Sequence, residues 1–214
     1  MLPRPSDKEG MASMSKSDVL STVIERKVTL QVPTASTRYL NELFALKCCG
    51  DLAPFFPNAK EVTESFALYT AARKYIGHAF LKDPNISVLC PGDGTAPRTA
   101  ATFALRSRWT AYSVDPLMRP KQVNGRHFVD RLHAIAADAN TFQLRAPRVL
   151  VASCHSHAKL SEVLRGIEAE RIDIISLPCC AQDNIGAPTH TYRDPAVWSP
   201  QNRVNIYLDW KAPA

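Results

Sequence analysis

A turn rich in glycine, aspartate and proline follows the apolar segment ISVLC, and its residue types suit the binding of a ligand. The stretch ISVLCPGDGTAPRTA runs over 86–100. Glycine lets a chain turn tightly and brings backbone amides close to a bound group. Thr95 can cap the helix that follows, and Pro97 suits its first turn. A dinucleotide, a mononucleotide or the chain itself are the candidates for what approaches Gly92 and Gly94.

The spacing of this turn discriminates between nucleotide-binding motifs. A dinucleotide fingerprint requires Gly or Ala where Pro97 stands, and a P-loop requires a Gly-Lys-Ser/Thr that does not follow. Both motifs therefore fail, which disfavours a nicotinamide enzyme. The pattern that fits is G-x-G-x-G with Ala96 in the last place.

Two acids follow the next two apolar segments. Asp115 comes after TAYSV, and Asp138 stands in AADAN. In a parallel sheet the carboxyl ends of the strands meet at one edge, so both acids are expected near the glycine turn. Three alternatives remain open: the glycines can form only a tight loop, Asp115 before a proline can be a turn residue, and Asp138 can cap the segment NTFQL.

The glycine turn and the two acids, in this order, resemble class I S-adenosylmethionine-dependent methyltransferases over about residues 84–210. The resemblance implies S-adenosylmethionine as the cofactor. It implies that Asp115 binds the ribose hydroxyls and that Asp138 accepts from the adenine amino group. The cofactor-binding residues expected on this basis are Cys90, Gly92, Asp93, Gly94, Asp115, Asp138, Ala139 and Ser153.

Two features depart from the family's pattern. The family usually carries an acid at the position of Cys90, where it helps to anchor the methionine amino group. Cysteine cannot supply that charge, and Asp93 is the candidate substitute. The antiparallel hairpin expected at the end of the domain is visible only as VNIYLDW. These departures favour a rival interpretation, a non-catalytic binding or scaffold module in a larger assembly.

Cysteines and histidines gather in two segments, ASCHSHAKL (152–160) and SLPCCAQD (176–183). Both are expected at the carboxyl edge of the sheet. They resemble a methyltransferase subgroup with Cys/His after strand four and Cys-Cys after strand five, which includes eukaryotic transfer-RNA ribose methyltransferases. The Asn/Asp-Pro-Pro-Tyr/Phe stretch of amino-methyltransferases is absent, because VASCHS stands after the fourth predicted strand. Its absence argues against adenine or glutamine nitrogen as the acceptor.

Three chemistries compete for these side chains. His155 or His157 can act as a general base, because histidine accepts a proton near neutral pH. Cys154, His157, Cys179 and Cys180 can form a tetrahedral zinc site, although adjacent cysteines seldom both bind one ion, so no metal is expected. Cys179 can attack a pyrimidine ring, although the Asp-x-Pro-Cys stretch that accompanies such a cysteine is missing. Cys180 is expected as a small buried hydrophobe. The catalytic residues expected are His155, His157 and Cys179.

The apolar patterning predicts the sheet that positions these residues. Short apolar runs alternate with helical ones, which is typical of a doubly wound, mostly parallel α/β sheet with helices on both faces. Strands are predicted at 86–90, 110–114, 132–137, 148–153, 172–177 and 204–208, with helices at 36–49, 60–81, 97–107 and 156–169. The domains expected are a disordered tail over 1–18, a mostly helical N-terminal extension over 19–83 and a Rossmann-like methyltransferase domain over 84–214.

Composition and cysteine content limit the number of domains and the compartment expected for the chain. With 214 residues, 45% of them hydrophobic, the chain can form one domain with a core and an extension. The N-terminal stretch lacks the apolar run of a secretory signal, and no apolar run is long enough to span a membrane. Six cysteines in two adjacent pairs and two singletons make a poor disulfide framework. An intracellular, cytoplasmic protein with reduced thiols is therefore expected.

A net charge of +6 permits binding to phosphates. Basic residues gather between the first and third predicted strands: Arg98, Arg106, Arg108, Arg119, Lys121, Arg126 and Arg131. RNA is therefore expected as the methyl acceptor, with Arg98, Arg119, Lys121 and Arg126 as contacts. Solvated arginines are the alternative, and two of the seven are expected to pair with acids. A protein or a small metabolite is the alternative acceptor.

Overall fold

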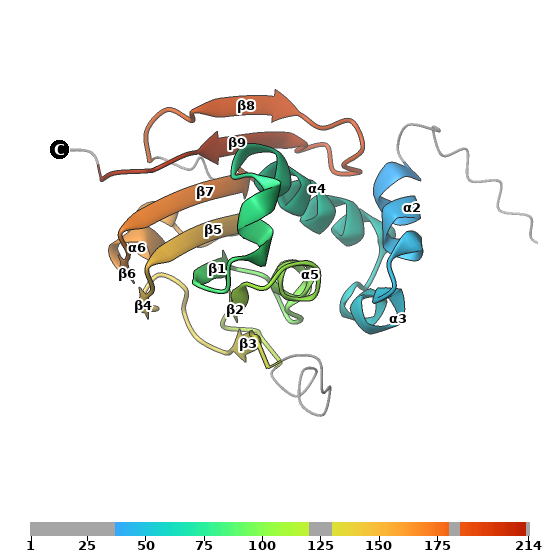
Figure 1. Cartoon of the computed structure of the whole chain (residues 1–214), viewed down its shortest axis with the longest axis horizontal. Coiled ribbons are helices and arrows are strands. Elements are labelled where there is room, and N and C mark those ends of the chain that lie inside the picture. Colours follow the sequence, from blue (N-terminus) through green and yellow to red (C-terminus); the bar gives the residue numbers. More distant parts are fainter. Residues whose placement is uncertain (1–36, 120–129, 180–184, 213–214) are drawn as a thin grey trace, which may run out of the picture. The chain divides into compact units, whose positions relative to one another are not determined.

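One seven-stranded sheet organises the chain. The computed structural model describes residues 37–119, 130–179 and 185–212 (Figure 1). The strand order is β3-β2-β1-β5-β7-β9-β8. The parallel strands are β1 (Ile86–Pro91), β2 (Thr110–Val114), β3 (Leu132–Ile135), β5 (Arg148–Cys154) and β7 (Arg171–Leu177). The antiparallel hairpin at one edge consists of β8 (His190–Arg193) and β9 (Arg203–Tyr207).

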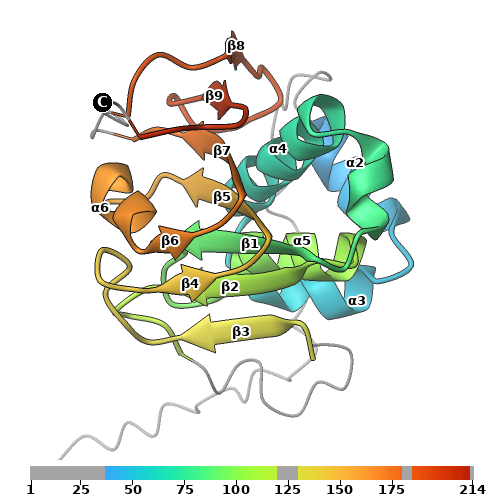
Figure 2. The ribbon, with the colours of Figure 1, turned by 60° about the vertical axis from the view of Figure 1, so that its left-hand side comes forward.

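Helices cover both faces of this sheet (Figure 2), which confirms the doubly wound prediction. The helices are α2 (Arg38–Ala45), α3 (Cys49–Leu52), α4 (Ala59–Tyr75), α5 (Arg98–Arg106) and α6 (Leu160–Arg165). Two 3-10 segments, η2 (Ala53–Phe55) and η3 (His78–Lys82), and a second small sheet of β4 (Leu144–Arg145) and β6 (Ile167–Glu168) complete the described elements. Because both faces are covered, the central strands are continuous apolar runs.

The two hydrophobic clusters show how each strand serves both faces. In β1, Val88 packs into the cluster shared with α4 and α5, whereas Leu89 packs into the cluster shared with α6. In β5, Leu150 and Val151 divide between the same two clusters. This alternation follows from the two-residue period of a strand. The alternation therefore determines toward which face of the sheet each side chain at a strand end points.

Helix α4 belongs to the core of the sheet domain. It begins at Asn58, whose side chain accepts a hydrogen bond of 3.1 Å from the backbone N–H of Glu61. Its residues Phe66, Ala67 and Leu68 are fully buried in the same cluster as Val88. The described part of the extension expected over 19–83 therefore packs onto the sheet.

Sequence and structure differ mainly at helix ends. The helix predicted over 60–81 ends at Tyr75 because Gly77 adopts a φ of 106°. The helix predicted over 36–49 ends at Ala45, since Leu46 is extended. The helix predicted over 156–169 is only α6, and the residues that follow it pair as β6. The expected tail over 1–18 lies outside the described residues. Within the described ranges, no helix is long and apolar enough to cross a membrane.

The cap at Asn58 generates a stability prediction. Asn58→Ala removes the acceptor for the Glu61 N–H and should lower the free energy of unfolding by about 0.5–2 kcal/mol. Asn58→Asp keeps the acceptor and should cost less. Urea denaturation followed by circular dichroism measures both variants, and equal losses would show that the cap does not stabilise α4.

Candidate active site

The glycine turn after β1 is held closely against the loop after β5. Gly92 and Gly94 have φ values of 66° and 79°, in the region that favours glycine. A Cβ on Gly92 would lie 2.3 Å from the side-chain Oγ of Ser156. The turn therefore requires glycine for its conformation and for its close approach to a neighbouring segment.

The side chain of Asp93 caps helix α5. It is 2% exposed and accepts hydrogen bonds from the backbone N–H groups of Thr99 (3.1 Å) and Ala100 (3.2 Å) and from the Ser113 hydroxyl (2.9 Å). Burial raises its pKa to about 6, although Arg98 and these donors oppose the rise. Asp93 was expected to replace the family's anchoring acid, but both its oxygens are engaged by the helix cap.

Asp115 joins the end of β2 to the glycine turn. It is half-buried, and its Oδ2 accepts a 2.9 Å hydrogen bond from the Gly94 N–H. Its Oδ1 accepts a 2.7 Å bond from the Leu117 N–H. The expected ribose-binding acid therefore lies beside the expected glycine turn, in contact with it.

Asp138 and Ala139 follow β3 in a turn. Asp138 is exposed, and its Oδ1 accepts a 2.9 Å hydrogen bond from the Asn140 N–H. Ala139 is buried in the cluster on the α6 face. No helix follows in the described segment NTFQL, so Asp138 caps a turn and not a helix.

The loop after β5 begins with a strained residue. His155 has a φ of 47°, which is uncommon for a residue with a side chain and costs energy. Its backbone N–H donates a 2.9 Å bond to the Leu177 carbonyl at the end of β7. Ser153, two residues earlier, is buried, and Cys154 packs against the cluster on the α4 face. His157 is exposed.

The candidate site residue that sequence analysis missed is Glu64 of α4. It is 1% exposed, and its Oε1 lies 3.0 Å from Nζ of Lys60 and 3.0 Å from Nε2 of His155. Among the described residues, neither Oε1 of Glu64 nor Nε2 of His155 has a partner aligned for a hydrogen bond. Burial would raise the pKa of Glu64, but His155 and Lys60 outweigh it and hold the pKa below its ordinary value. Glu64 therefore remains a buried carboxylate.

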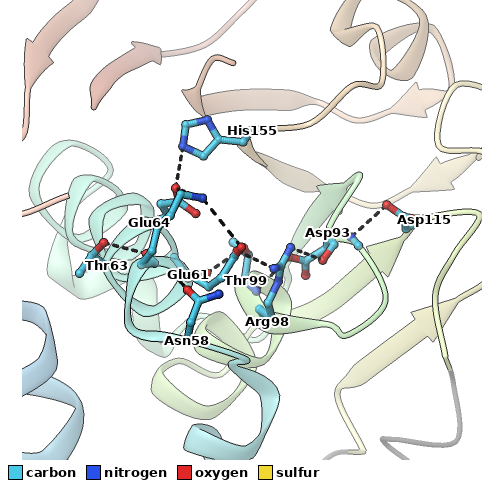
Figure 3. A network of polar contacts seen from close by, with 12 residues as sticks. Asn58, Glu61, Thr63, Glu64, Asp93, Arg98, Thr99, Asp115 and His155 are labelled. Carbon is cyan, nitrogen blue, oxygen red and sulfur yellow. Dashed lines mark hydrogen bonds and ion pairs between the residues drawn. The ribbon is translucent and has the colours of Figure 1, made fainter. Parts of the chain in front are cut away.

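A second acid of α4 is connected to the glycine turn through Arg98. Glu61 pairs with Arg98, which donates a 2.9 Å hydrogen bond to the backbone oxygen of Asp93. The Arg98 guanidinium also packs against Gly94. Figure 3 shows both acids between the loop that carries His155 and the turn that carries Asp93. The first two turns of α4 thus contact the loop after β5 directly and the turn after β1 through Arg98.

Two of the described cysteines near the site, Cys90 and Cys154, have thiols that burial makes unreactive. Burial raises the pKa of Cys90 and of Cys154 well above the ordinary value, so both are neutral near pH 7. Cys179 is half-buried just after β7, and Cys180 lies outside the described residues. Within the described ranges, no group of three or more His, Cys, Asp or Glu side chains could hold a metal ion.

Three of the seven basic residues serve the fold. Arg98 pairs with Glu61 and Arg106 with Glu42, as expected for two of the set. Arg131 donates to three backbone carbonyls at the end of α5 and the start of β2. Arg98 was expected to contact RNA, but its guanidinium is engaged within the protein. The exposed members in the described part are Arg108 and Arg119; Lys121 and Arg126 lie outside it.

Comparison with known proteins identifies the fold. No protein-family model matches the sequence, and no curated protein matches it either. A mutant of MtNAS matches at 14% identity over 84% of this chain and 70% of that chain, with a TM-score of 0.50. The same mutant in complex with S-adenosylmethionine matches at 13% identity over 83% and 72%, also at 0.50. A magnesium protoporphyrin IX methyltransferase from Synechocystis PCC 6803 with bound SAM matches at 12% identity over 83% and 97%, at 0.48.

These likenesses concern the fold alone. The chain has the class I methyltransferase fold, with a mostly parallel sheet and an antiparallel hairpin at one edge. The fold predicted from the glycine turn and the two acids is therefore confirmed.

The pKa of Asp93 generates a prediction about pH. Because the folded-state pKa of about 6 lies above the ordinary 3.8, the native state favours the protonated carboxyl. Its stabilising contribution is complete below the ordinary value and is lost as the pH rises through the folded-state value. The free energy of unfolding of the wild type minus that of Asp93→Asn should fall by roughly 2–3 kcal/mol between about pH 4 and 7. A difference that rises or stays constant would show that burial does not dominate.

Proposed function

We propose that this chain is an S-adenosylmethionine-dependent methyltransferase. The observation that carries the proposal is the contact between three segments at the carboxyl edge of the sheet. The glycine turn is bonded to Asp115 on one side and packs against Ser156 on the other. In open α/β sheets this edge is where ligands bind.

The residues present fit the cofactor. Gly92 and Gly94 form a tight turn with positive φ at the carboxyl end of β1, where open α/β sheets bind ligands. A carboxylate has about four lone-pair sites, and Asp115 uses two of them on backbone N–H groups, so its oxygens retain capacity for the ribose hydroxyls. Asp138 is exposed and can accept from the adenine amino group. Ala139 and Ser153 complete the expected binding set.

His155 is the candidate general base. When bound, the cofactor supplies the methyl group, and the protein mainly aligns donor and acceptor. His155 is positioned by its backbone bond to Leu177 and by the nearby carboxylate of Glu64. A neutral imidazole can take the proton of the acceptor, and Glu64 would stabilise the resulting imidazolium. His157 and Cys179, at the same edge of the sheet, are proposed to line the acceptor side.

RNA is the acceptor that we propose. Arg119 supports it: the side chain is exposed, and its backbone N–H donates a 3.0 Å bond to the Thr95 carbonyl beside the glycine turn. An exposed guanidinium beside the loop of the glycine turn suits a phosphate group of the acceptor. The net charge of +6 favours a polyanion in the same way.

Cofactor binding tests the proposal directly. S-adenosylhomocysteine should bind with a dissociation constant in the micromolar range by calorimetry, which corresponds to about 8 kcal/mol. Asp115→Ala should weaken binding by roughly 1–3 kcal/mol through loss of charge-assisted hydrogen bonds. Asp83→Ala, just before β1 at the opposite edge, is the matched control and should bind as the wild type does. If neither S-adenosylmethionine nor S-adenosylhomocysteine binds at about millimolar concentration, the chain is a non-catalytic scaffold module.

RNA binding has its own test. Affinity for mixed cellular RNA should fall steeply as salt is raised, and Arg119→Ala should reduce the log–log slope by about one unit. Arg145→Ala is the matched control, because Arg145 is exposed on β4 and pairs with Glu168. Binding that is indifferent to salt, or absent at low salt, would make a small molecule or a protein the acceptor.

A further inference from the structure

We propose that Glu64 holds the amino group at the amino-acid end of the cofactor, in place of the acid that the family usually carries at position 90. This inference rests on the proposed function. It explains how the chain binds the amino group of the cofactor although a cysteine stands at position 90.

Neither Cys90, which stands where the family carries an acid, nor Asp93 offers a carboxylate for the cofactor ammonium. Cys90 is 1% exposed, and its buried thiol is neutral. Asp93 uses its oxygens on the N–H groups of Thr99 and Ala100 and on Ser113. A cofactor ammonium therefore needs another acid at this edge of the sheet.

Glu64 lies near the carboxyl ends of β5 and β1. Its Oε1 lies 3.0 Å from Nε2 of His155, the residue that follows β5, and β5 pairs directly with β1, the strand that carries Cys90. Cys90 and Cys154 both face the hydrophobic cluster that α4 joins. The Glu64 carboxylate thus comes from α4 to the ends of β1 and β5. Its buried Oε1 has no aligned hydrogen-bond donor among the described residues.

Lys60 indicates which chemical group the Glu64 carboxylate accepts. Its Nζ is a primary ammonium, the same species as the amino group of the cofactor, and it lies 3.0 Å from Oε1 of Glu64. The Lys60 side chain is 47% exposed, so it can swing into solvent when another cation takes its place. The exchange keeps the buried carboxylate paired, which avoids the cost of an isolated buried charge.

The test compares two ligands that differ in this group. S-adenosylhomocysteine carries the amino-acid end, whereas 5′-methylthioadenosine lacks it and keeps the nucleoside. Calorimetry on the full chain should show that Glu64→Gln weakens S-adenosylhomocysteine binding by about 10- to 100-fold, the effect of one buried charge-assisted bond. Binding of 5′-methylthioadenosine should change less than about twofold, which also shows that the variant is folded.

Glu162→Gln, on the opposite face of the sheet, is the control and should bind both ligands as the wild type does. Equal weakening of both ligands by Glu64→Gln, or no weakening of either, would overturn the inference and leave the proposed function intact. Failure of the wild type to bind either ligand would overturn the proposed function itself.

Lys60→Ala gives a prediction of opposite sign. Because Lys60 competes for the same carboxylate, its removal should leave S-adenosylhomocysteine binding at least as tight as in the wild type. If Glu64 and Lys60 serve only the fold, both variants should weaken it. A loss of more than about threefold in Lys60→Ala would therefore overturn the inference, even if Glu64→Gln does not fold.

Discussion

The candidate site depends on the buried negative charge of Glu64. A carboxylate that is 1% exposed is tolerated only if cations or donors surround it, and removal of one partner leaves an uncompensated charge. The surrounding groups come from two elements: Lys60 from α4 itself and His155 from the end of β5. This requirement constrains where the first turns of α4 lie relative to the sheet. It also constrains the backbone of His155, whose φ is 47°.

A second set of contacts connects α4 to the other half of the site. Glu61 pairs with Arg98, and Arg98 bonds to the backbone of the glycine turn. Asp93 then uses its side chain to begin α5, while its backbone oxygen accepts from Arg98. The helix that looks like an extension in the sequence is thus the element that joins the two sides of the carboxyl edge.

The sheet was predictable from sequence, and much of the site was not. Six strands of the main sheet coincide with short, mostly apolar runs of the sequence, and these runs were sufficient to predict them. Strand β8 was not predicted because its residues HTYR are mostly exposed and polar. The position of Asp115 beside the glycine turn was predictable from its spacing along the chain. Glu64 was not, because its partner His155 lies far along the chain and only tertiary packing brings them together. Likewise, the cap role of Asp93 depends on contacts with Ser113.

Hydrogen–deuterium exchange with and without S-adenosylhomocysteine tests the central claim most directly, because it reports on all segments of the edge at once. The account predicts that saturating ligand slows exchange together in residues 58–66, 91–98 and 153–156, the start of α4, the glycine turn and the loop after β5. Protection of the glycine turn without protection of the start of α4 would contradict the claim that α4 forms part of the cofactor site.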